Sequence, residues 1–189
     1  MYNNRNIFLL NKYIIQKNNL FSEDILKNIN CLNNEIYNTL KNKKKIFICG
    51  NGGSAAISEH VACDLIKNFK FKGKKLIISL TSNSALTTMI SNDFGYDKIF
   101  SYQLDQFASN KDLLIIISSS GDSENVFKAF IKAKKLNMKI FSLVGFNGGR
   151  IKKKMKSNII HIKSQDYGII EDCHQSIFHA IISLSHQKP

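Results

Sequence analysis

Tryptophan is absent from this sequence of 189 residues, and its one proline is the last residue. No linker or low-complexity stretch interrupts the chain, so we expect a single domain over residues 1–189. Apolar runs stay well short of the roughly 18–20 residues that a membrane-spanning helix needs. The stretch MYNNRNIFLLNKYIIQKNN lacks a signal-peptide plan, because Asn11 and Lys12 interrupt its apolar part and no small-residue cleavage site follows. These absences predict a cytoplasmic protein with no membrane partner.

Paired cysteines are also missing, because the four cysteines are scattered and no CxxC motif occurs. This pattern is typical of reduced, mostly buried thiols in a reducing compartment. Cys173 precedes His174 and lies six residues before His179, so a cysteine nucleophile is kept as an alternative. Proximity in sequence is weak support for it, since neighbours in sequence are often not neighbours in a site.

Acidic residues are scarce: 14 Asp and Glu stand against 27 Lys and Arg, for a net charge of +13. Lys, Asn and Ile are enriched throughout, which favours a solvated surface with a compositional bias. The alternative is that the charge attracts an anionic ligand or partner. Neither an RNA-recognition signature nor a zinc-finger spacing accompanies the lysine runs, so nucleic acid is not expected as a partner.

The first 42 residues have helical patterns. Residues 5–17 carry apolar side chains at near-helical spacing, and Ser22 is the expected N-cap of a second helix. That helix has acidic residues in its first turn and an apolar stripe formed by Ile25, Ile29, Leu32, Ile36 and Leu40. The apolar side chains of these two helices must be buried against other parts of the protein, and the surface of a partner subunit is one possibility.

From residue 43 onward the pattern becomes that of alternating strands and helices. Short apolar runs at 45–49, 75–80, 113–117, 139–144 and 158–162 alternate with helical patterns at about 54–69, 84–91, 97–107, 123–136 and 169–186. Runs that are apolar on both faces are typical of parallel strands covered by helices on both sides. The sequence therefore predicts a doubly wound α/β domain with a five-stranded parallel sheet over residues 43–189 and an N-terminal helical extension over 1–42.

Ligands of such sheets bind beyond the carboxyl ends of the strands, where two turns have unusual chemistry. The turn CGNGGS at 49–54 has glycines that allow close backbone approach and amides at a helix start that favour an anion. The turn SSSGDS at 118–123 offers several hydroxyl groups beside another helix start. Taken singly, the turn at 49–54 can be explained as a plain tight turn without a ligand. The turn at 118–123 can be explained as a cluster of side chains that cap the following helix. Together they favour phosphate binding.

A third polar segment, SNDFGY at 91–96, is expected to be a turn after the helix over 84–91. A polar turn explains it without a ligand. Alternatively, the side chains of Asn92 and Asp93 hydrogen-bond the hydroxyl groups of a sugar.

The motifs NGGS, NDFGYD and SSSGDSENV, followed by a late helix with paired histidines, closely resemble those of the sedoheptulose-7-phosphate isomerases (phosphoheptose isomerases) of the SIS fold group. The resemblance covers nearly the whole chain. It implies a homotetramer that packs its N-terminal helices between subunits, and conversion of sedoheptulose 7-phosphate to a heptose phosphate for surface polysaccharide. It also implies one zinc ion per subunit.

Carried over position by position, the resemblance implies catalytic roles for Asp64 and His179. The implied metal ligands are His60, Asp64, Glu171 and His179. The implied substrate contacts are Asn51, Gly52, Gly53, Ser54, Asp64, Asn92, Asp93, Ser118, Ser119, Ser120, Ser123 and Glu171. The sequence departs from the family pattern at two of these positions, because Asp64 stands where Glu is usual and Glu171 where Gln is usual.

These departures bear on the chemistry. His60 and Asp64 are one helical turn apart and share a helix face, whereas Glu171 and His179 are eight residues apart, about 12 Å along an ideal helix. Asp is shorter than Glu, so either the backbone compensates, or the substrate differs, or the activity is reduced.

Two alternatives to the isomerase stay open: a non-catalytic SIS protein that binds a replication-initiator-type partner, and a sugar-phosphate sensor.

Overall fold

The structure, a computed structural model, describes residues 4–187, so residues 1–3 and 188–189 of the expected domain lie outside the described part. Helices and strands alternate after two initial helices, as expected. In chain order the elements are α1 (Asn4–Asn18), α2 (Glu23–Lys41), β1 (Ile46–Cys49), α3 (Gly53–Lys67), β2 (Ile77–Ser79), α4 (Ser84–Phe94), the 3-10 helix η1 (Tyr96–Lys98), α5 (Ile99–Phe107), β3 (Leu113–Ser118), α6 (Glu124–Lys135), β4 (Lys139–Val144), α7 (Gly149–Lys154), β5 (Ile159–His161) and α8 (Tyr167–Ser185).

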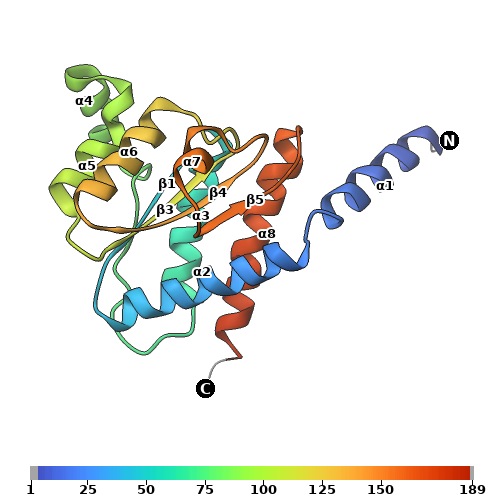
Figure 1. The fold of residues 1–189 in the computed structure, drawn as a ribbon, viewed down its shortest axis with the longest axis horizontal. Helices are drawn as coiled ribbons and strands as arrows, with labels where there is room; N and C mark the ends of the chain where they lie inside the picture. Colours follow the sequence, from blue (N-terminus) through green and yellow to red (C-terminus); the bar gives the residue numbers. More distant parts are fainter. Residues whose placement is uncertain (1–3, 188–189) are drawn as a thin grey trace.

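All five strands are parallel and lie in the order β2-β1-β3-β4-β5 (Figure 1). The expected doubly wound α/β fold is confirmed. β1 pairs with β2 on one side and with β3 on the other, so Ile46 lies between Ile77 and Leu113. The strand order reverses at β1, and ligands of open parallel sheets bind outside the carboxyl ends of the strands at such a point. The turns after β1 and β3 therefore meet there.

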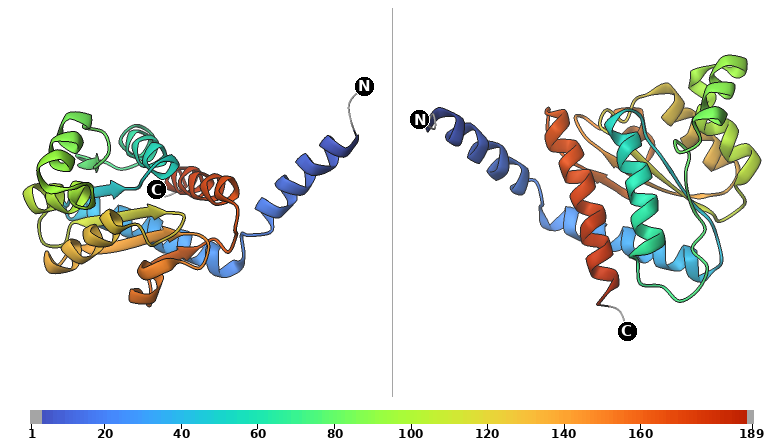
Figure 2. Two further views of the ribbon diagram at one scale, coloured as in Figure 1. Left: turned by 90° about the horizontal axis from the view of Figure 1, so that it is seen from above. Right: turned by 180° about the vertical axis from the view of Figure 1, so that it is seen from behind.

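Alternate residues of β1, β3, β4 and β5 enter two separate cores, which explains why these strands are apolar on both faces, whereas Ile78 of the edge strand β2 is exposed. Ile46 and Ile48 of β1 pack into the core with α2, α3 and α8, whereas Phe47 and Cys49 pack into the core with α4, α5, α6 and α7. The predicted stripe of α2 lies in the first core, with Ile29, Leu32, Ile36 and Leu40 buried and Ile25 packed against them. Figure 2 shows the two helical layers on either side of the sheet.

Two segments differ from the sequence expectation. Asn92 and Asp93 lie in the last turn of α4, not in a turn after it, because the helix ends only where Gly95 adopts φ +98°. Lys152, Lys153 and Lys154 form the end of α7, where no helix was predicted. The apolar pattern of so short a helix is weak, and the residue that precedes it as N-cap is Gly148, at φ +83°.

Helix α1 extends away from the sheet and its covering helices (Figures 1 and 2). It has no buried residue, and six of its large apolar side chains are exposed: Ile7, Phe8, Leu9, Leu10, Ile14 and Ile15. Its contact with the body of the molecule is with α8, where the Tyr13 hydroxyl donates to Asp172 at 3.1 Å.

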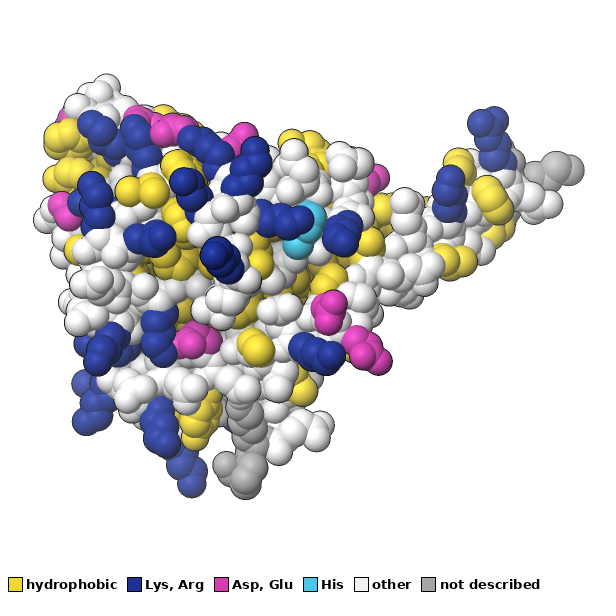
Figure 3. Space-filling model, in the orientation of Figure 1, with side chains coloured by type: hydrophobic (Ala, Val, Ile, Leu, Met, Phe, Trp, Pro, Cys, Tyr) yellow, Lys and Arg dark blue, Asp and Glu magenta, His cyan; other side chains and the backbone are white. Residues whose placement is uncertain are grey.

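Positive charge is concentrated in one part of the chain. Residues 125–165, which run from α6 to the loop before α8, contain no Asp or Glu. Their lysines lie over α6, α7 and the loops beside them on the face drawn in Figure 3, where few acidic side chains interrupt them. None of the helices within residues 4–187 combines the length and the apolar character of a membrane span.

Candidate active site

The turns after β1 and β3 enclose a small cavity together with the start of α8. Its volume is about 130 Å³, and it is lined by Asn51, Ser54, Ser118, Ser119, Ser120, Ser123, Tyr167 and Glu171. All of these except Tyr167 were expected to contact substrate. The volume is below the roughly 300–1,000 Å³ of pockets that enclose a whole small molecule. It is suited to one end of a ligand.

Three serine hydroxyl groups in this cavity are arranged to donate to an anion. The Ser118 hydroxyl accepts from the Gly121 amide at 3.1 Å, and the Ser120 hydroxyl accepts from the Asp122 amide at 3.2 Å. A hydroxyl that accepts from an amide keeps its own proton free to donate. Among residues 4–187 the buried Ser119 hydroxyl has no partner at all. The start of α6 adds its free amides, so the cavity has the donors that a phosphate group requires.

The loop after β3 is held in shape by the loop after β4. The Gly145 amide donates to the Ser119 carbonyl at 2.9 Å, and the Ile151 amide donates to the Gly121 carbonyl at 3.0 Å. Gly121 has φ +63°, and a Cβ atom there would collide with the Gly148 carbonyl. Only glycine therefore fits where the two loops cross.

Arg150, the second residue of α7, binds the same loop through its guanidinium group. Nε donates to Asp122 Oδ1 at 2.7 Å, Nη2 to the Asp122 carbonyl at 2.6 Å and Nη1 to Glu124 Oε2 at 2.8 Å. The guanidinium carbon also lies 4.4 Å from the centre of the Phe127 ring. These bonds hold the pKa of Asp122 below its usual value. They also tie the polar turn at residues 118–123, called the serine loop below, to the start of α6.

Replacing Arg150 with methionine is therefore expected to loosen the serine loop and raise KM for a phosphorylated substrate about tenfold. The reason is the loss of the three hydrogen bonds that the guanidinium group donates to Asp122 and Glu124, which hold the loop in the shape that binds phosphate. Steady-state kinetics on Arg150→Met, with Lys154→Met as a control that removes the same charge from the same helix, checks this. An equal KM in the two variants would show that charge alone is responsible.

The first turn is fixed by a pair of amide side chains. Asn51 Nδ2 donates to Asn125 Oδ1 at 2.8 Å, and Asn125 Nδ2 donates to Asn51 Oδ1 at 2.9 Å. The Tyr96 hydroxyl donates to Asn51 Oδ1 at 3.2 Å. The segment after α4 thus contacts the site through Tyr96. Asn92 and Asp93 are exposed, bond to each other at 2.8 Å and do not line the cavity.

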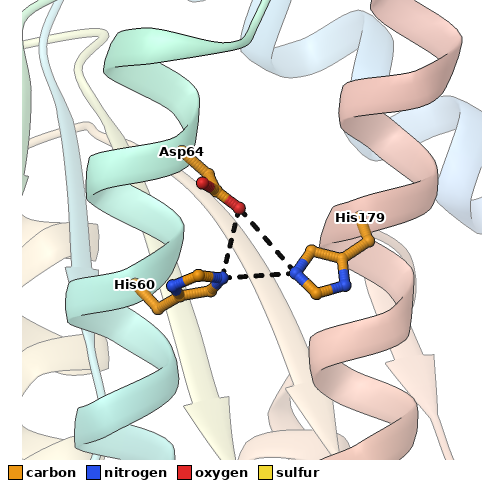
Figure 4. A group of neighbouring side chains, drawn as sticks. All are labelled: His60, Asp64 and His179. Atoms are coloured by element: carbon orange, nitrogen blue, oxygen red, sulfur yellow. Dashed lines mark hydrogen bonds and ion pairs between the residues drawn. The ribbon is translucent and has the colours of Figure 1, made fainter.

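A second group of side chains lies between α3 and α8 (Figure 4). His60 Nε2 lies 3.2 Å from Asp64 Oδ2 and 3.2 Å from His179 Nε2, and His179 Nε2 lies 3.8 Å from Asp64 Oδ2. The shared helix face of His60 and Asp64 follows from their spacing, whereas His179 is 119 residues from His60 in sequence. The packing of α3 beside α8 brings the three together.

This group fits a zinc ion. Zinc bonds to histidine nitrogen and carboxylate oxygen of about 2.0–2.2 Å, at tetrahedral angles, place ligand atoms roughly 3.3–3.6 Å apart. The three distances of 3.2, 3.2 and 3.8 Å span this range. Two imidazoles and one carboxylate are also a donor set that zinc binds in catalytic sites.

Glu171 lies outside the His60–Asp64–His179 cluster. Its carboxylate is against Gly53 at the start of α3, where a Cβ atom would collide with it, and it lines the serine cavity. It is absent from the cluster of metal-binding side chains found among the described residues. Gln175, one turn before His179, lies at that cluster instead, with its Nε2 2.9 Å from His179 Nε2.

Cys173 and His174, which the cysteine-nucleophile alternative invokes, are both buried on α8. Burial raises the pKa of the Cys173 thiol to about 11 and lowers the pKa of the His174 imidazole to about 4. Cys173 therefore remains a neutral thiol at physiological pH, which argues against the alternative of a cysteine nucleophile. His174 is neutral and packed inside the fold.

Some residues of the site were not anticipated from the sequence. Asn125 lies two residues after Ser123, within the motif SSSGDSENV, and its position was a usable signal. Gln175 lies four residues before His179, which places it on the same helix face. Tyr96 lies within the motif NDFGYD, which was itself a signal, whereas Arg150 and Tyr167 had none, because each reaches the site from another part of the fold.

Comparison with known proteins agrees with this geometry. Residues 12–145 match the SIS domain family model. A phosphoheptose isomerase of Helicobacter pylori (strain P12) is 38% identical over 175 residues, which is 92% of this chain and 89% of the relative. One from Nitratiruptor sp. is 42% identical over 146 residues, covering 77% of this chain and 78% of the relative.

Solved structures agree as well. The phosphoheptose isomerase of Francisella tularensis superimposes with a TM-score of 0.88 at 26% identity, over 100% of both chains. That of Neisseria gonorrhoeae gives 0.86 at 29% identity, over 98% of both chains. With its fold, its serine cavity and its His–Asp–His cluster, the chain belongs to the phosphoheptose isomerases of the SIS domain family.

Proposed function

We propose that this chain isomerises sedoheptulose 7-phosphate to D-glycero-D-manno-heptose 7-phosphate through an enediol, for heptose in surface polysaccharide. The observation that carries the proposal is the placement of the serine cavity and the His60–Asp64–His179 cluster along α3 and α8. His60 is seven residues after Gly53, about 10.5 Å along the helix. An extended seven-carbon sugar is about that long, so a phosphate in the cavity places the carbonyl end near the cluster.

The serine loop binds the phosphate and orients the sugar. Ser118, Ser119 and Ser120 donate to its oxygens, and the Glu171 carboxylate accepts from sugar hydroxyl groups near Gly53. Holding the far end of the chain in this way converts binding energy into alignment of the reacting carbons.

Asp64 and His179 then move the protons. The Asp64 carboxylate takes a proton from the carbon beside the carbonyl and returns it to the neighbouring carbon, while the His179 imidazole transfers a proton between the two oxygens. Asn68 Nδ2 donates to Asp64 Oδ1 at 3.2 Å and orients the carboxylate. Zinc bound at the cluster would polarise the carbonyl and stabilise the negative charge that develops on oxygen.

Incubation of the purified protein with sedoheptulose 7-phosphate in deuterium oxide, with and without zinc, tests this function. We expect aldose phosphate to form and deuterium to enter the carbon that exchanges its proton. Binding of the ketose phosphate without product or deuterium uptake would identify a sugar-phosphate sensor. Absence of binding would favour the non-catalytic protein that binds a replication-initiator-type partner.

We propose further that the chain forms a homotetramer in which α1 packs between subunits. Six apolar side chains of α1 are exposed, with Leu10 65% and Ile14 52% accessible. Burial of one such side chain is worth about 1.5–3 kcal/mol, so an interface that covers α1 is strongly favoured. The four unpaired thiols agree with a cytoplasmic location.

Changing both Leu10 and Ile14 to aspartate is expected to shift the protein to smaller species, because each charge would have to be buried at the interface. Light scattering coupled to gel filtration measures the mass, with Asn11→Asp as a control on the same helix. A tetramer that survives both aspartates would exclude α1 from the interface.

A further inference from the structure

Tyr167, the first residue of α8, lines the serine cavity, which is the cavity between the turns after β1 and β3. The other residues that line it are polar or acidic: Asn51, Ser54, Ser118, Ser119, Ser120, Ser123 and Glu171. One aromatic ring therefore forms part of the wall of a cavity whose other side chains are all polar. What distinguishes this ring from the serines around it is its bulk.

Tyr167 lies at the end of the cavity away from the His60–Asp64–His179 cluster. It precedes Glu171 by four residues, so the two side chains share a face of α8 and are about 6 Å apart along the helix axis. His179 is eight residues beyond Glu171, about 12 Å further along the axis. In the proposed function the sugar runs from the cavity towards that cluster. The Tyr167 ring is therefore behind the phosphate, on the side opposite the sugar.

The Tyr167 ring is held in place by Phe146, which follows β4. The centroids of the two rings are 4.6 Å apart and the ring planes are at 82°, an edge-to-face contact. Phe146 has φ +42°, a conformation that is rare for a bulky residue and persists only where the surroundings fix it. Its amide donates to the Ser164 carbonyl at 3.1 Å, and its carbonyl accepts from His161 Nε2 at 2.9 Å. The backbone that carries the Phe146 ring is thus fixed on both sides.

His161, in β5, holds the Phe146 carbonyl as a neutral imidazole. Its proton is on Nε2, so Nδ1 is free to accept from Lys152 Nζ at 3.0 Å. Burial lowers the pKa of His161, which keeps the ring neutral as this arrangement requires. Phe146 also packs against the core that includes α2, α3 and α8. The Phe146 ring is therefore a rigid support for Tyr167.

A rigid ring behind the phosphate limits what the cavity can bind. A phosphate monoester has one organic substituent, the sugar, and needs no second opening. A phosphodiester has a second substituent, which would have to leave through the place that Tyr167 occupies. The cavity has a volume of about 130 Å³, well below that of pockets that enclose a whole small molecule, so the second substituent cannot fold back inside it.

We propose that Tyr167, supported by Phe146, is a specificity-determining residue that restricts the serine cavity to phosphate monoesters and excludes phosphodiesters. The assignment rests on the phosphate cavity of the proposed function. It separates sugar monophosphates from ligands in which the phosphate joins the sugar to a second organic group.

Calorimetric titration of the full-length protein tests the assignment without reference to turnover. The ligands are glycerol 3-phosphate and glycerophosphoglycerol, the diester that carries a second glycerol. They differ in charge as well as in size, so the ratio of their dissociation constants is compared between variants. We expect the wild type to prefer the monoester and Tyr167→Ala to reduce that preference at least about tenfold, because the clash that excludes the diester is removed.

Two matched variants control for this change. Tyr167→Phe keeps the ring and should match the wild type. Phe107→Ala removes an exposed aromatic ring at the end of α5, away from the cavity, and should also match it. A wild type without preference for the monoester, or an unchanged ratio in Tyr167→Ala, would overturn the assignment.

Phe146→Ala tests the support of the ring. It should reduce the preference in the same direction as Tyr167→Ala but by less, because the Tyr167 ring remains and only its support is lost. Phe146→Tyr keeps an aromatic ring and should retain the wild-type ratio. Thermal unfolding of each variant separates a loss of fold from a loss of selectivity. An unchanged ratio in Phe146→Ala would overturn the supporting role of Phe146.

Kinetics with the ketose phosphate supplies a second readout. Opening the wall behind the phosphate weakens the binding of substrate and transition state alike, so Tyr167→Ala should raise KM several-fold with little change of kcat. A wild type that forms product but binds the diester as tightly as the monoester overturns the specificity assignment alone. A wild type that prefers the monoester through Tyr167 but neither forms product nor exchanges deuterium overturns the isomerase function alone.

Discussion

Replacing His179 with alanine is expected to lower kcat for the ketose phosphate by about 10²–10⁴-fold, the usual contribution of a general acid–base group. Its imidazole is the one side chain of the cluster that α8 positions against both His60 and Asp64. The side chain is 55% exposed, so its removal should leave thermal unfolding almost unchanged. Product formation and deuterium exchange measure the loss.

His186→Ala is the matched control for this change. His186 follows the same helix, and its Nε2 lies 3.1 Å from the Asn68 carbonyl, outside the cluster. We expect it to retain full activity. Equal activity of the His179 variant and the wild type would remove His179 from the mechanism. Recovery of the His179 variant by excess zinc would assign the residue to metal binding instead of proton transfer.

Replacing Asp64 with asparagine should produce a loss of at least about 100-fold in kcat, because asparagine keeps the shape of the side chain but cannot accept the proton. Asp64 Oδ2 lies 3.2 Å from one imidazole and 3.8 Å from the other, so the same change also removes the negative charge that faces both. Glu59→Gln, an exposed acid on the same helix, is the control. An Asp64→Asn protein that still exchanges deuterium at the normal rate would exclude Asp64 as the base.

The aspartate at position 64, where glutamate is usual, has a structural explanation. Asp64 reaches both imidazoles directly, and Asn68, one turn later, donates to its other oxygen at 3.2 Å. The structure thus favours compensation by position over reduced activity. Asp64→Glu is therefore expected to be impaired, since an added methylene moves the carboxylate by about 1 Å and such a misplacement costs on the order of 100-fold. An Asp64→Glu protein faster than the wild type would show that the site remains better suited to glutamate.

Local patterns predicted most of the fold. The five strands, the apolar stripe of α2 and the helices that follow β1 and β3 were all readable, because burial on both faces of a sheet and on one face of a helix leaves a period in the sequence. The end of α4 was not, because Asn92 and Asp93 have the composition of a turn while Gly95 ends the helix. α7 was missed because six residues are too few to show a period.

The sequence by itself determined the parallel sheet, the two polar turns at its carboxyl edge and the shared helix face of His60 and Asp64, because each depends on residues close together in the chain. Only the tertiary structure decided which side chains of α8 reach that face. His179 and Gln175 lie beside His60, whereas Glu171 lies against Gly53 at the start of α3, because the answer depends on how α8 lies against α3. Contacts between distant elements follow from packing, which no local pattern records.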